Sequence, residues 1–147
     1  MKFLSVAFIT ISNLMFAQDI DIVRNNYLKA TNNKELCSEM IDKLSDAKQS
    51  VFIAYLGAYQ TLWANHTASP LSKWNTFKKG KKNIEKAIAS EPTNPETRLL
   101  RLSVQLNAPR FLGYFSDIEA DKTIVNQQRQ ILFQNKTIKE LYQQLLK

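Results

Sequence analysis

Glycine, proline and cysteine are scarce in this chain, whose 147 residues include only 3 Gly, 4 Pro and 1 Cys. So few glycines leave little from which to build tight hairpins or phosphate-binding loops. A single cysteine cannot form an intrachain disulfide, which excludes a disulfide-stapled scaffold. Beyond the N-terminal segment, no run is long and apolar enough to cross a bilayer. The composition therefore excludes collagen-like, disulfide-rich and membrane-bundle proteins.

What the chain does contain is sufficient for one folded domain. Its residues are 44% hydrophobic and 22% charged, with a formal net charge of +7. No alternating strand pattern occurs, and apolar residues recur at helical spacing throughout. We therefore expect an all-α fold of about six or seven helices, arranged as antiparallel hairpins.

The N-terminus has the pattern of a secretory signal peptide. Lys2 precedes an uncharged, largely apolar run that continues through Phe16, and acids first appear at Asp19. This order is typical of an export signal, with cleavage expected after Ala17. We predict a signal peptide over residues 1–17, a single helical domain over 18–147, and a periplasmic or secreted location.

The most apolar segment, residues 50–66, is predicted to be the central helix. A long connection should follow it, with the next helix starting at Lys73. In the helix expected from Pro95 to Asn107, Leu106 should face inward, and Arg98, Arg101 and Gln105 outward.

Two stretches near the C-terminus carry further expectations. The segment 107–115 is unusually apolar, and it either folds back over the helices or forms an exposed patch. Capping boxes are expected at Thr93 with Glu96 and at Ser116 with Glu119, and the second should open a helix reaching Leu132.

Small and bulky residues between positions 56 and 92 follow a repeat pattern. Gly80, Ile84, Ala87 and Pro92 fill the small, bulky, small and turn-proline positions of a second repeat helix, and Leu56-Gly57 matches the pair on the first. The chain thereby resembles a tetratricopeptide repeat. The resemblance implies a short stacked array of hairpins whose helices touch at the small residues.

The chain also resembles small exported helical proteins of Bacteroidetes bacteria. That resemblance implies a cell-envelope location and supplies no activity. The segments that carry it are Tyr55-Leu56-Gly57-Ala58, Trp63-Ala64-Asn65-His66, Phe77-Lys78-Lys79-Gly80-Lys81-Lys82 and Pro109-Arg110-Phe111-Leu112-Gly113-Tyr114.

Sequence motifs of catalysis are missing. The chain has no Gly-x-Ser-x-Gly, His-Glu-x-x-His, Cys-x-x-Cys or glycine-rich phosphate loop. Local ligand spacing for a metal is also missing around His66, the only histidine. We therefore predict a protein that is not an enzyme and has no cofactor or metal.

Aromatic residues suggest a binding groove beside the connection that follows residue 66. Tyr59, Trp63, His66 and Trp74 are predicted to line it, with Lys78 and Lys82 at its rim. His66 could act as a base or ligand in this groove, or it could cap carbonyls at a helix end.

Lysines form the clearest charged feature. Lys78, Lys82 and Lys86 recur every four residues, with Lys79 beside them. Like charges at this spacing repel by about 0.2 to 0.5 kcal/mol per pair. This basic face either binds an acidic partner or is a solvated surface partly neutralised by Glu85 and by the acidic face of residues 33–47.

Together these patterns favour a module that binds a protein or peptide, and the basic face admits an acidic partner. The alternative is a small-ligand or lipid carrier with an aromatic pocket between helices. Nucleic acid is disfavoured by the expected export.

Overall fold

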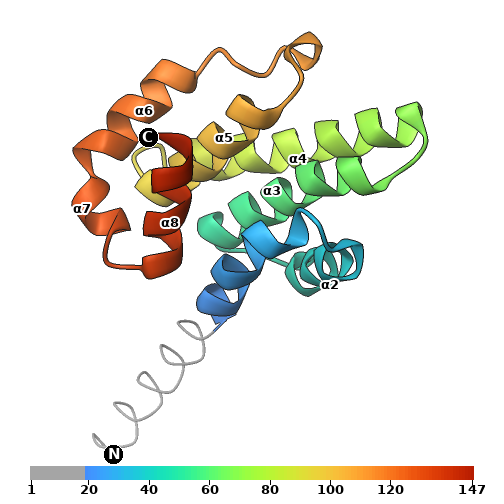
Figure 1. The fold of residues 1–147 in the computed structure, drawn as a ribbon, viewed down its shortest axis with the longest axis horizontal. Helices are drawn as coiled ribbons and strands as arrows, with labels where there is room; N and C mark the ends of the chain where they lie inside the picture. Colours follow the sequence, from blue (N-terminus) through green and yellow to red (C-terminus); the bar gives the residue numbers. More distant parts are fainter. Residues whose placement is uncertain (1–18) are drawn as a thin grey trace, which may run out of the picture.

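The computed structural model describes residues 19–147, and it confirms the all-α prediction. The predicted signal peptide and its cleavage position lie outside the described residues. Within 19–147 there is no strand. The chain is helical over 19–30 and then forms α2 (Lys34–Leu44), α3 (Ser50–His66), α4 (Pro70–Ser90), α5 (Pro95–Asn107), a 3-10 turn η1 (Arg110–Leu112), α6 (Ile118–Gln127), α7 (Arg129–Leu132) and α8 (Lys136–Leu145) (Figure 1).

Helices α3 and α4 form an antiparallel hairpin at the centre of the molecule (Figure 1). Near one end, the Ser50 hydroxyl donates to the Ala87 carbonyl at 2.9 Å. Near the middle, a Cβ built on Gly57 would lie 2.5 Å from the Gly80 carbonyl oxygen, and the reverse distance is also 2.5 Å. The two backbones therefore touch at the two glycines, because neither residue has a side chain to hold them apart.

Helix α3 is buried along an unbroken stretch from Ile53 to Thr61. It packs against α2, α4 and α5, and the Tyr59 hydroxyl donates to the Val23 carbonyl in the helix over 19–30 at 2.7 Å. A helix that is apolar all round belongs inside a protein. The expectation of a central helix is thus confirmed.

The connection before α4 is shorter than predicted. Helix α4 starts at Pro70 rather than Lys73, because the Ser69 side chain accepts from the Ser72 amide and Pro70 occupies the first turn. Proline suits that position, where its missing N–H has no helical partner anyway. Only residues 67–69 separate α3 from α4, so the extra length is helix and not loop.

Both predicted capping boxes are wrong. Helix α5 is capped by Asn94, whose side chain accepts from the amides of Glu96 and Thr97. Helix α6 begins after Asp117 without a side-chain cap bond, and the Ser116 hydroxyl turns to the Asp117 carboxylate instead. An asparagine carbonyl accepts from the first free amides as well as a hydroxyl does, and here it lies one residue nearer.

The outward prediction for two polar residues of α5 is also wrong. Arg101 and Gln105 are buried, because both bind the buried carboxylate of Asp121. Leu106, predicted to face inward, is instead exposed. Helix α5 therefore uses one polar stripe to hold α6.

The C-terminal helices return to the start of the chain. The helix predicted to reach Leu132 is interrupted at Gln128, whose side chain donates to the Thr93 carbonyl. Helix α8 then lies against the helix over 19–30, where the Thr137 hydroxyl meets Asn25 at 2.6 Å. Among residues 19–147, no helix has both the length and the hydropathy needed to span a bilayer.

Candidate functional site

An open apolar groove of about 670 Å³ lies where five helices and the 3-10 turn meet. It is formed by the end of α3, the beginning of α4, the end of α5, the helix over 19–30, η1 and α8. Its apolar lining comprises Tyr27, Leu28, Leu62, Ala64, Pro70, Trp74, Phe77, Val104, Ala108, Pro109, Phe111, Leu112, Leu141 and Leu145. We call this feature the apolar groove.

The rim of the apolar groove exposes two large aromatic side chains. Trp74 is 44% exposed and Phe111 is 86% exposed, whereas Phe77 beside them is buried. Exposed aromatic residues beside a concave apolar surface are typical of interaction sites. The rim is therefore accessible to a partner.

The polar groups of the groove floor are bonded within the protein. The Tyr27 hydroxyl shares a 3.3 Å hydrogen bond with Ser103, and the Thr61 hydroxyl donates to the Ala58 carbonyl. Burial raises the pKa of Tyr27 to about 12, so this phenol is neutral near pH 7. These hydroxyls are thus satisfied within the protein, and Lys73 is the one charged residue of the groove lining.

A second, shallower hollow of about 400 Å³ adjoins the apolar groove. Trp74, Phe77 and Leu112 line both cavities. The remaining lining residues are Lys78, Lys81, Lys82 and Glu85. We call this feature the lysine hollow.

Aromatic rings hold two of the hollow's lysines. The Lys78 ammonium lies 5.8 Å from the centre of the Trp74 ring, and the Lys81 ammonium lies 4.8 Å from that of Tyr114. Such contacts are worth about 0.5 to 1 kcal/mol at exposed sites. They position the ammonium groups without neutralising them.

No carboxylate of the described residues forms an ion pair with these lysines. Glu85, the only acid on α4, is instead bound by the Tyr114 hydroxyl at 2.6 Å and by Arg101 at 3.0 Å. Burial, followed by the hydrogen bond to Glu85, raises the pKa of Tyr114 well above its ordinary value. The lysine hollow therefore keeps its positive charge, since Glu85 faces another cation.

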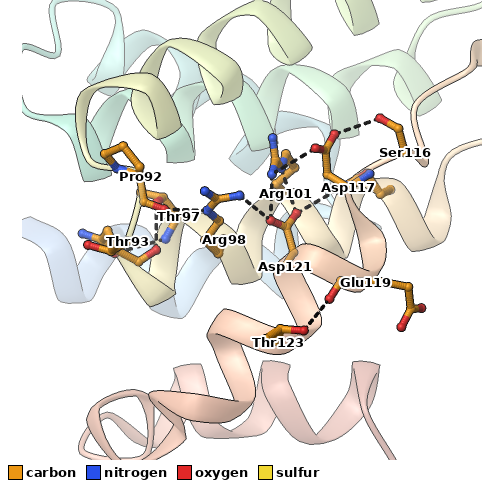
Figure 2. A network of polar contacts seen from close by, with 12 residues as sticks. Pro92, Thr93, Thr97, Arg98, Arg101, Ser116, Asp117, Glu119, Asp121 and Thr123 are labelled. Carbon is orange, nitrogen blue, oxygen red and sulfur yellow. Dashed lines mark hydrogen bonds and ion pairs between the residues drawn. The ribbon is translucent and has the colours of Figure 1, made fainter.

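An ionic network lies between α5 and α6 (Figure 2). Asp121 is fully buried, and it accepts from Arg98 at 2.9 Å and from two nitrogens of Arg101 at 2.7 and 2.8 Å. Gln105 donates to the same carboxylate at 2.9 Å. Burial opposes the charge on Arg101, but the hydrogen bonds and charge of Asp121 outweigh it and raise the Arg101 pKa. Asp121 thereby joins α6 to α5.

The predicted aromatic groove is not assembled as one surface. Tyr59 is fully buried, and Trp63 lies next to His66, with ring centres 5.9 Å apart and the Lys34 ammonium over the Trp63 ring. Of the four predicted residues only Trp74 lines the apolar groove. Sequence spacing placed the other three on one face of α3, but that face turns toward the helix over 19–30 and α2.

His66 has a structural role at the end of a neighbouring helix. Its Nε2 lies 2.9 Å from the carbonyl oxygen of Ala30, the last residue of the first described helix. A terminal carbonyl of this kind has no partner within its own helix. His66 thus bonds the end of a neighbouring helix, and it lies apart from both cavities.

The predicted basic face divides into two parts. Lys78 and Lys82 line the lysine hollow, whereas Lys79 and Lys86 are exposed outside both cavities. Sequence reasoning missed Lys81 as a site residue. Its spacing of seven residues from Trp74 puts the two on one face of α4 and could have identified it.

The lone thiol does not complete a reactive centre. Cys37 is buried and donates to the Tyr59 carbonyl at 3.4 Å, and burial raises its pKa to about 11. A buried thiol with a raised pKa is a poor nucleophile. Within residues 19–147, no cluster of three His, Cys, Asp or Glu side chains could hold a metal ion.

No protein-family model matches the chain, and neither a curated protein nor a solved structure is detectably similar to it.

Proposed function

We propose that this chain is an exported, non-enzymatic helical module that binds a protein or peptide partner in its apolar groove. The observation that carries the proposal is the open rim, where Trp74 and Phe111 stay exposed beside a cavity of about 670 Å³. Interface hot spots are rich in large aromatic side chains that desolvate fully on binding. A partner that covers this rim would bury both rings.

The tetratricopeptide-like character of the module belongs to the same proposal. Supporting it, the α3–α4 hairpin has its closest approach at Gly57 and Gly80, the small positions that the repeat pattern requires. Repeats of this kind use concave surfaces to hold peptides.

Export is the second part of the proposal. It rests on the sequence of residues 1–17, in which a positive charge precedes an apolar run and a small residue precedes the expected cleavage position. Mass spectrometry of the protein purified from its native cells would test it, because cleavage after Ala17 yields a chain beginning at Gln18. Recovery of a chain that begins at Met1 would contradict export through this signal.

The proposed absence of catalysis has support from the polar groups of the groove. The hydroxyls of its floor use their hydrogen bonds within the fold, and the histidine bonds a helix end elsewhere. An acid–base centre needs a titratable group within reach of substrate.

The proposed interaction can be tested by photo-crosslinking from inside the groove. A photoreactive phenylalanine analogue at position 111 would face the partner, whereas the same analogue at 115 is a matched control. Phe115 is also an exposed aromatic residue of this loop, but it does not line the groove. We expect a discrete protein adduct from position 111, abolished by Trp74→Ala, and none from 115. Equal adducts from both positions would contradict groove binding.

A small-ligand or lipid carrier is the second candidate, favoured by one observation. A cavity of about 670 Å³ with a mainly apolar lining falls within the range that holds small molecules, roughly 300 to 1,000 Å³. Native mass spectrometry of protein purified from its own cells would detect a retained lipid or metabolite. A ligand lost in Trp74→Ala but kept in Phe115→Ala would favour the carrier, and a ligand-free mass would count against it.

A further inference from the structure

We infer that the partner of the apolar groove is an acidic peptide segment whose carboxylates enter the lysine hollow while its apolar side chains fill the groove. This inference rests on the proposed function and names the chemistry of the partner. It is carried by the continuity of the two cavities and by the unpaired charge in one of them.

Continuity comes from three residues that belong to both cavities. Trp74, Phe77 and Leu112 separate the apolar lining from the lysines, so one occupant can touch both. The lysine side begins at Lys78 and extends to Lys82, and eight residues of helix from Trp74 span about 12 Å. The segment should therefore carry acids within about two helical turns of its apolar anchors.

The positive charge of the lysine hollow favours an occupant with negative charge. Lys78, Lys81 and Lys82 have no carboxylate partner among residues 19–147, and Glu85 is already held by Arg101 and Tyr114. A neutral or basic segment would bury three ammonium groups without compensation, which opposes binding. Carboxylates would form charge-assisted hydrogen bonds there.

Preorganisation favours the same occupant. The rings of Trp74 and Tyr114 hold Lys78 and Lys81, so these side chains lose less freedom when a carboxylate binds. Lys73, which also lines the apolar groove, adds a fourth positive charge to the lining of the two cavities.

The test selects peptides on the full-length protein and reads their sequences. The probe is a phage-displayed library of random peptides about 16 residues long, enough for roughly four helical turns. Selected peptides are then measured against K78E/K81E/K82E and against K48E/K79E/K86E. The second triple variant reverses the same number of lysines, all exposed and outside both cavities.

We expect enriched peptides to combine large apolar residues with Asp or Glu. Their affinity should fall roughly tenfold to a hundredfold in K78E/K81E/K82E and less than about threefold in the control variant. Since Lys81 packs on Tyr114, thermal unfolding must show that the variant folds. K81Q removes only one charge and should weaken binding in the same direction.

Three other outcomes would overturn the inference, and they differ in what they leave standing. Groove-dependent peptides without acids, binding both triple variants equally, would remove the acidic partner but keep the proposed function. If no peptide depends on Trp74, both fail. If palmitate binds in a Lys78- and Lys81-dependent manner and no peptide is enriched, the occupant is a single-chain amphiphile and the carrier replaces the peptide-binding module.

Discussion

At the scale of single residues, the most consequential side chain is the carboxylate of Asp121. It is fully buried, yet four hydrogen bonds from Arg98, Arg101 and Gln105 satisfy it. A buried ion pair adds little net stability compared with apolar residues of the same volume, but removing one partner leaves a costly uncompensated charge. Replacing either Asp121 or Arg101 alone should therefore destabilise the fold.

Asp121→Asn should lower the free energy of unfolding by about 3 kcal/mol, because the buried Arg101 guanidinium loses its two-pronged ion pair and keeps only the partly exposed Glu85 and Asp117 nearby. Urea denaturation would measure the change. The matched control is Glu119→Gln on the same helix, an exposed acid whose one ion pair among residues 19–147 is with Lys122, and it should stay within about 0.5 kcal/mol.

Replacing Asp121 together with Arg101 separates the ionic explanation from loss of packing. If the uncompensated guanidinium causes the loss, R101M/D121L should be more stable than Asp121→Asn alone. A double variant that is less stable than the single one would show that the network contributes through its hydrogen bonds to other residues.

The buried thiol of Cys37 predicts a loss of stability at high pH. Its pKa is raised by burial from 9.0 to about 11, so the folded protein holds the proton that the unfolded chain releases. The stabilisation that comes from keeping this thiol protonated is fully present below pH 9. As the pH rises to 11, the free energy of unfolding falls by roughly 2 to 3 kcal/mol. Denaturant titrations at pH 8, 9, 10 and 11 would measure it.

Cys37→Ala provides the control for that titration. The stability gap between the native chain and the variant should narrow from pH 9 to pH 11, because only the native chain carries the thiol. Tyr27, whose pKa is raised by burial to about 12, still titrates in both proteins. Parallel curves would contradict the assignment to Cys37.

At the scale of elements, the α3–α4 hairpin depends on the absence of two side chains. A Cβ at Gly57 or Gly80 would lie 2.5 Å from the facing carbonyl oxygen, which forces the helices apart. Gly57→Ala and Gly80→Ala should each cost about 3 kcal/mol or more. Helix propensity alone predicts the opposite sign, a gain of roughly 0.5 to 1 kcal/mol.

Thermal or urea unfolding would distinguish these two expectations. Lys79→Ala, at the exposed neighbour of Gly80, is the matched control and should change stability by less than about 0.5 kcal/mol. A stabilising Gly80→Ala would show that the helices can separate at no cost.

Elements were the part of this fold most accessible from sequence, for a physical reason. The helical spacing of apolar residues depends on local chemistry, and the helix predicted over residues 50–66 is α3 (Ser50–His66). The burial of Arg101 could not be predicted in the same way, because its partner lies 20 residues away on another helix. Helical periodicity assigns every polar residue to the solvent-facing side of its helix, so it cannot indicate a buried arginine.

The candidate site could be predicted from sequence only where its residues share one helix. Trp74, Lys78 and Lys82 all lie on α4, and their spacing placed them together. The other predicted aromatics lie on α3, which is apolar on every side, so its sequence has no polar face to show which way Tyr59 turns. The rest of the groove comes from segments distant in sequence.

At the scale of the whole molecule, the two ends of the described chain are bound to each other. The Thr137 hydroxyl donates to Asn25, and Asn135 donates to Asp21, across more than a hundred residues. Helix α8 also contacts α5 and lines the apolar groove through Leu141 and Leu145. In an array held only by neighbouring repeats, the last helix would affect the first very little.

Deleting residues 136–147 should therefore destabilise the whole fold, because Ile138 and Leu141 are buried and their loss exposes the helix over 19–30. We expect a lower unfolding midpoint and faster amide exchange in both that helix and α5, measured by hydrogen exchange. Removing Lys147 alone is the control and should change neither. If exchange rose only next to the deleted helix, the molecule would behave as a chain of independent hairpins, and the groove would be formed by units that need not fold together.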